Sequence, residues 1–328
     1  METSGKLAIV IPAYKGEFFE QAIESIATQT NKDFTLYIGD DASPHDLEKI
    51  VKPFKKQISI VYKRFENNLG ANNLIAHWNR CIDLIQDEEW IWFFSDDDLM
   101  EPTCIELFYR HIKSNPSHTL LHFNLQIIDQ SNTPLYKALK FDPYFSATDF
   151  FKKRLNNEIH SCAVEYVFKR SLFEQVNRFE SFDLAWASDD ATWIKLSAQN
   201  GINTIDGAYV RWRQSDFNIS PKSDVSTVHR KLNATINYIM WVKDFFQQHN
   251  LSDASSEIEK ASYPIRVITH TKSLSLKEKF SLITYVVKSL DASKLRLRMT
   301  LFWAFLELKE AAKRLINYNE RVSAELKK

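Results

Sequence analysis

The stretch WIWFFSDDDLMEP, from Trp90 to Pro102, places four aromatic residues in five positions directly before three consecutive aspartates. The aromatic run is typical of a strand that is buried on both faces of a sheet. Asp96, Asp97 and Asp98 follow at its end, where their like charges repel one another. A divalent cation would turn this repulsion into ligation, because magnesium is usually held by one or two carboxylates together with substrate phosphates.

Two other interpretations of this acidic triplet are open to the sequence. Asp96 or Asp98 could cap the helix that begins near Pro102, as part of an ordinary solvated turn. A calcium loop would need oxygen ligands at regular spacing, but the DxDxDG pattern of such loops is absent. The place of the triplet in the predicted sheet favours the cation.

The triplet ends a series of strand–helix units that begins near the N-terminus. Apolar, β-branched runs predict strands at LAIVIPAY (7–14), FTLYIGDDAS (34–43) and ISIVYKRF (58–65), with helical periodicity between them. This alternation predicts an α/β fold with an open, mostly parallel sheet and helices on both faces. Ligands of such sheets bind at the carboxyl ends of the strands, so we expect Tyr14, Asp41 and the triplet at one edge.

Composition excludes several classes of protein. The chain has 328 residues, 44% of them hydrophobic, which allows a large core and argues against disorder. The net charge of zero gives no case for nucleic-acid binding. The three cysteines form no CxxC pair, so neither a zinc site nor a disulfide framework is indicated. No apolar run is long enough to span a bilayer or has the form of a signal peptide, which predicts a cytoplasmic protein.

Charge divides the chain into two predicted regions. Residues 1–220 carry 23 Lys and Arg against 31 Asp and Glu, whereas residues 221–328 carry 19 against 11. Beyond its first four strands, the acidic N-terminal region shows a strand pattern at 119–130 and a helix pattern at 146–155. The basic C-terminal region is almost entirely helical, with helices predicted at 226–249, 254–273, 275–289 and 293–326.

The last predicted helix contains KLRLRMTLFWAFLELKEAAKRL (294–315), which is apolar around most of its circumference and has basic flanks. Three interpretations of this C-terminal region stay open: packing on the N-terminal region, contact with a second copy in a homo-oligomer, or peripheral contact with the inner face of the cell membrane. Its apolar core is too short to span the membrane.

Five segments resemble, in this order, the family 2 inverting glycosyltransferases of the GT-A fold: VIPAY, SIATQT, IGDDAS, ENNLG with WNRCI, and FFSDDDLMEP. The resemblance covers Leu7 to Ser220. It implies a catalytic domain at 1–220 that moves a sugar from a nucleoside-diphosphate sugar, a UDP-sugar as first choice, to a hydroxyl of a glycan or lipid-linked acceptor in bacterial surface polysaccharide synthesis. Residues 221–328 lie outside it.

Two other functions compete with this one. A non-catalytic module that binds a sugar nucleotide or a glycan would have the same fold. A sugar nucleotidyltransferase would need a glycine-rich loop with Lys or Arg after the first strand, and VIPAYKGEFF has a single glycine. Neither the GxxxxGK[ST] loop nor GxGxxG occurs, so kinase and dinucleotide-binding functions lose their best marker.

The resemblance implies roles for individual residues at the donor. The implied donor-binding residues are Pro12, Ala13, Tyr14, Asp41, Asn79, Arg80, Asp96 and Arg213. The first three would line the base and the ribose, and Asp41 would accept a hydrogen bond from a ring N–H of the base. Asp97 and Asp98 would bind Mg²⁺ or Mn²⁺. The chain departs from the family at Lys15, where Asn is common, and at Trp78, where Arg is common.

An inverting transferase also needs a base for the acceptor hydroxyl, a contribution that is typically about 10²–10⁴ in rate. Asp190 matches the family's base, in an acidic pair with Asp189 that precedes an amphipathic helix, although helix capping would also explain the pair. The segment AYVRWRQSDFNIS (208–220) resembles the loop that closes over the diphosphate, with Arg213 as phosphate ligand and Arg211 toward solvent. His160 and Asn124 could lie near the acceptor, and His160, as a lone histidine, is interpreted as structural.

Overall fold

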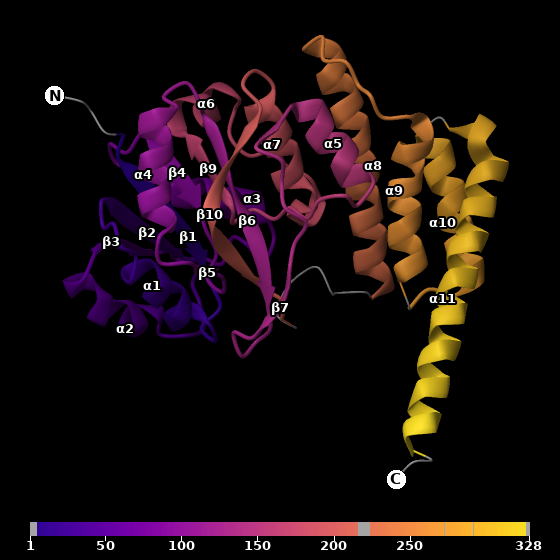
Figure 1. The fold of residues 1–328 in the computed structure, drawn as a ribbon, viewed down its shortest axis with the longest axis horizontal. Coiled ribbons are helices and arrows are strands. Elements are labelled where there is room, and N and C mark those ends of the chain that lie inside the picture. The colour runs from indigo at the N-terminus through magenta and orange to yellow at the C-terminus, as the bar shows by residue number, and fades with distance from the viewer. Residues whose placement is uncertain (1–4, 216–223, 272, 291, 326–328) are drawn as a thin grey trace.

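The computed structural model describes residues 5–215, 224–271, 273–290 and 292–325 (Figure 1). Within these ranges a ten-stranded sheet has the order β3-β2-β1-β4-β9-β6-β10-β5, with β7 beside β6 and β8 beside β10. Its strands are β1 (Leu7–Ala13), β2 (Phe34–Asp40), β3 (Ser59–Arg64), β4 (Trp90–Phe93), β5 (Leu99–Met100), β6 (Leu120–Ile128), β7 (Pro134–Lys137), β8 (Tyr144–Phe145), β9 (Tyr166–Lys169) and β10 (Ile202–Arg213).

The predicted parallel half of the sheet is confirmed. β1 pairs in parallel with β2 and β4, and β2 pairs in parallel with β3. β1, β2 and β4 are buried because helices cover both faces, which is why β1 and β4 have continuous apolar sequences. Beyond β4 the sheet is mixed, since β9 is antiparallel to both β4 and β6, whereas β10 is parallel to β6.

Helices account for the rest of the regular structure. They are α1 (Phe19–Ala27), α2 (Leu47–Val51), α3 (Leu74–Ile82), α4 (Cys104–Ser114), α5 (Ala147–Leu155), α6 (Arg170–Gln175), α7 (Ser188–Ser197), α8 (Val225–Gln248), α9 (Glu257–His270), α10 (Leu276–Ser289) and α11 (Arg296–Glu325). The four predicted C-terminal helices are thus confirmed to within a few residues. Capping boxes fix where two of them begin: the Ser256 hydroxyl accepts from the N–H of Glu259, and the Ser275 hydroxyl accepts from that of Glu278.

Strand β10 corrects the sequence analysis. The segment from residue 208 was expected to be a loop, but residues 202–213 form one long strand with a register shift between Ile205 and Tyr209. Its glycine and polar residues obscure the alternation that would mark a strand. The remainder of the predicted loop, at 216–220, lies outside the described residues.

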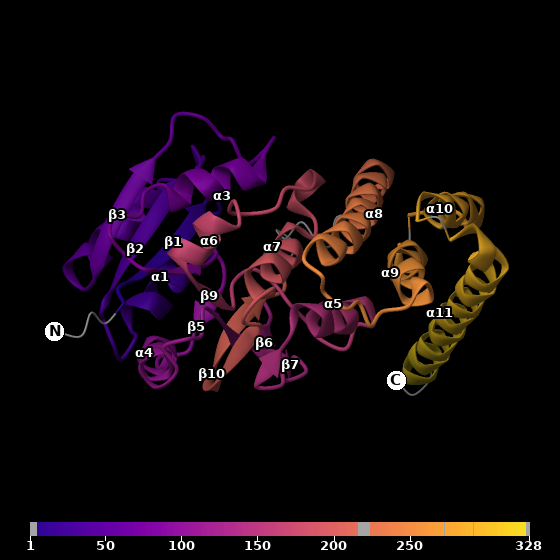
Figure 2. The same ribbon diagram turned by 90° about the horizontal axis from the view of Figure 1, so that it is seen from above.

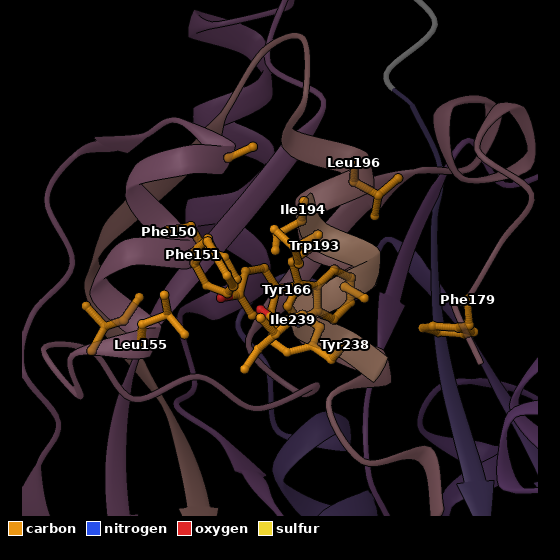
Figure 3. Close-up of a cluster of buried hydrophobic side chains, with 14 of the residues drawn as sticks. Phe150, Phe151, Leu155, Tyr166, Phe179, Trp193, Ile194, Leu196, Tyr238 and Ile239 are labelled. Atoms are coloured by element: carbon orange, nitrogen blue, oxygen red, sulfur yellow. The ribbon is translucent and has the colours of Figure 1, made fainter. Parts of the chain in front are cut away.

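One apolar core joins the sheet region to the helical region. Phe151 of α5 and Trp193 of α7 lie in the same buried cluster as Tyr238 and Ile239 of α8 (Figure 3). The rings of Phe151 and Tyr238 are 5.9 Å apart, edge to face. Seen from above, α8 and then α9 lie beyond the sheet, and α10 and α11 lie on the far side of α9 (Figure 2). The described residues contain no helix with the length and apolarity of a membrane span.

Candidate donor site and acidic pair

The carboxyl ends of the parallel strands bring the predicted donor segments into contact. Ala13 at the end of β1 is in register with Asp40 at the end of β2. Just beyond these ends, the backbone N–H groups of Tyr14 and Lys15 donate to the carboxylate of Asp96 at 2.9 and 2.8 Å. The segment after β1 and the acidic triplet after β4 therefore form one site, with Tyr14 42% exposed at its surface.

Lys15 offsets the repulsion within the triplet. All three aspartates are at least 96% buried. The Lys15 ammonium pairs with the carboxylate of Asp97 and lies 3.2 Å from Oδ1 of Asp96. Burial lowers the pKa of Lys15, but the charges of Asp96 and Asp97 outweigh burial and raise it above its usual value. Burial raises the pKa of Asp96, and Lys15 opposes that shift.

Asp98 is held differently from its two neighbours. Its carboxylate accepts hydrogen bonds from the Ser95 hydroxyl at 2.5 Å and from the backbone N–H of Arg213 at 2.6 Å. Burial and the charge of Asp97 raise the pKa of Asp98 to about 7. The end of β10 is thereby tied to the triplet.

The triplet fits a divalent cation that arrives with a substrate phosphate. Among the residues that the structure describes, no three His, Cys, Asp or Glu side chains are grouped to hold a metal ion by themselves. The carboxylate of Asp97 has partners that can turn away, the Lys15 ammonium and the Ser95 hydroxyl. Because magnesium needs only one or two carboxylates when phosphates complete its shell, Asp97 and Asp98 suit such an ion.

Asp41 fixes the loop that follows β3. Its carboxylate accepts from the N–H groups of Leu69 and Gly70, both at 2.8 Å, and pairs with the guanidinium of Arg80. A Cβ atom on residue 70 would lie 2.6 Å from Oδ2 of Asp41, so glycine is required for this approach. The contact of Asp41 with the base of a nucleotide stays a prediction.

The two predicted donor residues of α3 have different surroundings. Arg80, besides its pairing with Asp41, lies over the ring of Phe65 with 3.9 Å between guanidinium and ring centre. Asn79 precedes it, and its buried side-chain oxygen has no hydrogen-bond partner among the described residues. Pro12, the next-to-last residue of β1, is partly exposed.

Arg213 was predicted as a phosphate ligand in a loop, but it is the last residue of β10 and fully buried. Its Nε donates to the backbone carbonyl of Asp97 at 2.7 Å, and its Nη1 donates to that of Asp129 at 3.0 Å. These contacts hold the Arg213 guanidinium against backbone carbonyls, and its role as a phosphate ligand stays a prediction. Arg211 is partly exposed and pairs with Glu101 at 3.0 Å.

The acidic pair lies in the first turn of α7, not before it. This helix is buried nearly all round, so the amphipathic helix predicted here is also wrong. Both oxygens of Asp190 are held by the guanidinium of Arg154 on α5, at 2.8–3.0 Å. Asp189 is partly exposed, and its Oδ1 accepts from the N–H of Asp190 at 2.9 Å. Burial and the charge of Asp190 raise the pKa of Asp189 to about 7, against the effect of Arg154.

The two aspartates of the pair face different surroundings. Burial raises the pKa of the Cys162 thiol, and the charges of Asp98 and Asp189 both add to this shift. Both Asp190 and Asp189 raise the pKa of Tyr238 on α8, after the larger effect of burial. Asp190 is buried against Arg154 of α5, and Asp189 is the more exposed carboxylate of the pair.

His160 and Asn124, the two residues that could lie near the acceptor, both have partners within the protein. His160 lies with Nε2 3.4 Å from Sγ of Cys162, and burial lowers its pKa to about 4. The side-chain oxygen of Asn124 accepts from the N–H of Phe141 at 3.0 Å. The sequence analysis missed Arg154, whose only local signal is one basic residue among the apolar positions of a predicted helix.

The mixed sheet with its acidic strand ends and its flanking helices defines a GT-A-type glycosyltransferase fold. The sequence pattern of glycosyl transferase family 2 matches residues 8–176, and the chain belongs to this family. An uncharacterized glycosyltransferase of Rickettsia felis is 26% identical over 211 residues, which cover 61% of this chain and 32% of that protein. Another, from Methanocaldococcus jannaschii, is 24% identical over a stretch that covers 59% of this chain and 65% of that protein.

The chain thus spans between about a third and two thirds of the length of these relatives. Solved structures of S. aureus TarS 1–349 share the fold over 93% of this chain and 88% of that one. The complex with UDP-GlcNAc gives a TM-score of 0.68 at 14% identity, and the complex with UDP gives 0.64 at 15%.

Proposed function

We propose that this protein transfers a sugar from a nucleoside-diphosphate sugar, with UDP as the first choice of nucleotide, to an acceptor hydroxyl with inversion at the anomeric carbon. The observation that carries the proposal is the contact between the segment after β1 and the acidic triplet after β4, at the edge where such sheets bind ligands. The UDP and UDP-GlcNAc complexes of the similarly folded TarS support a uracil nucleotide.

At the donor, Asp97 and Asp98 would hold Mg²⁺ or Mn²⁺. Such an ion, once bound, neutralises charge that develops on the leaving diphosphate. The chain adds a charge of its own, since the Lys15 ammonium lies against Asp96 and Asp97. With a cation on Asp97, the Lys15 ammonium would be available to face the phosphates. Tyr14, exposed beside this site, would stack on the nucleotide.

At the acceptor, the acidic pair of α7 would supply the base. The sequence analysis assigned this role to Asp190, but an arginine already holds both oxygens of that carboxylate, which leaves them less open to an acceptor hydroxyl. We assign the role to Asp189, the more exposed carboxylate of the pair, with Asp190 and Arg154 as positioning residues. The acceptor oxygen bonds to the anomeric carbon, the carbon–oxygen bond to the diphosphate breaks, and Asp189 takes the hydroxyl proton.

Calorimetric titration with UDP, GDP and dTDP, with and without Mn²⁺, tests the donor site on the wild type and on Asp97→Ala. We expect UDP to bind with Mn²⁺ and this binding to be lost in Asp97→Ala. Asp129→Ala, at an aspartate outside the triplet, is the matched control. Absence of binding for all three nucleotides would overturn the donor assignment.

Turnover separates a transferase from a binding module on the same fold. With UDP-sugars and a panel of glycan and lipid-linked acceptors, we expect product whose anomeric proton coupling shows inversion of the donor's configuration. Binding of UDP without any transfer or donor hydrolysis would favour the non-catalytic module. The acceptor that the protein uses in this experiment tests the predicted role in surface polysaccharide synthesis.

A further inference from the structure

We propose that the outer face of α11 docks on a membrane surface that contains anionic lipids. The helix carries four large apolar side chains that are mostly exposed: Leu297 at 73%, Leu301 at 61%, Phe305 at 62% and Leu308 at 71%. An α-helix turns by about 100° per residue, so these four fall within an arc of about 80°. They form one stripe about 16 Å long.

The stripe faces away from the rest of the molecule. The opposite side of α11 is the side that packs, with Met299 99% buried and with Phe302 and Trp303 against the core. In both Figure 1 and Figure 2, α11 lies at the end of the molecule remote from β3. Within the part of the chain that the structure describes, the stripe is thus an unpartnered apolar surface of the kind that marks an interaction site.

The charged side chains beside the stripe indicate which kind of surface the stripe binds. Arg298 and Lys309 are exposed along one edge of it by helical rotation, and Lys294 and Arg296 are exposed at its N-terminal end. By helical rotation, Glu307 lies on the packed side, where it accepts from the Lys279 ammonium at 2.7 Å. An apolar stripe with basic side chains along one edge and at one end, with Glu307 turned inward, is typical of helices that lie in the interface of anionic membranes.

The same charges disfavour a second copy of the chain as the occupant. If two stripes packed on each other, each helix would bring its exposed cations against those of the other, and like charges at an interface are costly. An anionic lipid surface instead provides the opposite charge. The inference does not depend on the donor site, because no residue of that site takes part.

Vesicle sedimentation tests the proposal with the full chain. We expect the wild type to sediment with vesicles of equal parts phosphatidylcholine and phosphatidylglycerol, and much less with phosphatidylcholine alone. The double change Leu301→Gln with Phe305→Gln should lower the partition coefficient at least tenfold. Arg298→Glu with Lys309→Glu should lower it by roughly tenfold or more at low salt.

Matched controls use exposed residues elsewhere on the molecule. Tyr136→Gln with Leu139→Gln removes two exposed apolar side chains near β7, and Lys52→Glu with Lys56→Glu reverses two exposed charges after α2. Neither control should change vesicle binding. Asp97→Asn should also bind as the wild type does, which separates this test from that of the donor site.

Several outcomes would overturn the proposal. One is a wild type that stays in the supernatant with anionic vesicles at low salt. A second is binding that the stripe variant retains, or that the controls lose to the same extent. A third is a dimer by light scattering that dissociates in Leu301→Gln with Phe305→Gln while no vesicle binding occurs, since a second copy would then cover the stripe.

Discussion

Arg154 and Asp190 form a two-pronged ion pair between α5 and α7: Nε of the arginine lies 3.0 Å from each carboxylate oxygen, and Nη2 lies 2.8 Å from Oδ2. The carboxylate is buried, and the guanidinium is four-fifths covered. Bidentate geometry of this kind needs a planar guanidinium, which a lysine cannot imitate. The pair locks the first turn of α7 and so sets the direction of Asp189.

Removal of Arg154 should therefore destabilise the protein. We expect Arg154→Met to lower the free energy of unfolding by about 3–5 kcal/mol, because it leaves the Asp190 charge buried without its partner. Urea denaturation measures this loss. Arg110→Met, which removes an exposed partner of Glu106, is the control and should change stability by less than about 1 kcal/mol. Equal effects of the two substitutions would contradict the role given to the ion pair.

The base assignment predicts different defects for the two acids of α7. Asp189→Asn should lower kcat by about 10²–10⁴ with little change in stability. Asp190→Asn should lower the free energy of unfolding in addition to kcat, because it breaks the ion pair with Arg154. Asp183→Asn, at an exposed aspartate paired with Arg230, is the control. Full activity in Asp189→Asn together with a stable, inactive Asp190→Asn would return the role to Asp190.

Transfer should also depend on pH in a way that the pKa of Asp189 sets. A base must be ionised to accept a proton, and the pKa of Asp189 is raised to about 7. Hence kcat/KM should rise about tenfold per pH unit below pH 7 and level off above it. A pH–rate profile of the wild type measures this. A profile that is flat from pH 5 to 8 would be inconsistent with Asp189 as the base.

Lys15 should compete with the metal for Asp97. In Lys15→Met the triplet loses its positive partner, so the melting temperature without metal should fall and the increase on adding Mn²⁺ should be larger than in the wild type. Lys6→Met removes an exposed ion pair with Asp87 and serves as the control. The idea fails if Mn²⁺ raises the melting temperature equally in Lys15→Met and the wild type.

The structural interpretation of Arg213 can be separated from the phosphate-binding one. Because its guanidinium donates to backbone carbonyls in a buried site, Arg213→Lys should destabilise the protein by a few kcal/mol. Thermal denaturation measures this, with Arg211→Lys as the more exposed control. A stable Arg213→Lys variant with weakened UDP binding would instead support Arg213 as a phosphate ligand.

The sequence predicts the parallel half of the sheet well, because β1, β2 and β4 are buried on both faces and carry a continuous apolar signal. It predicts the meeting of Tyr14 with the triplet for the same reason, since parallel strands share an edge. Strand β10 escapes prediction because its polar and glycine residues obscure the period of two, and its register shift breaks what remains.

Contacts between side chains that are far apart in the chain cannot be predicted in this way. Lys15 and Asp97 are 82 residues apart, and Arg154 and Asp190 are 36 apart, so no local pattern joins them. The sequence marks Arg213 as important, but no local pattern shows that its guanidinium lies against the backbone carbonyls of Asp97 and Asp129. Only the fold decides which partner is within reach.

The aromatic core shared by α5, α7 and α8 has a consequence for synthesis on the ribosome. The sheet is complete once β10 has been made, yet Phe151 lacks its aromatic ring contacts until Tyr238 and Phe246 of α8 emerge. The nascent chain therefore passes through a stage in which a finished sheet carries an open aromatic surface. Such surfaces attract chaperones and promote aggregation, so a pause in translation between β10 and α8 should lower the yield of native protein.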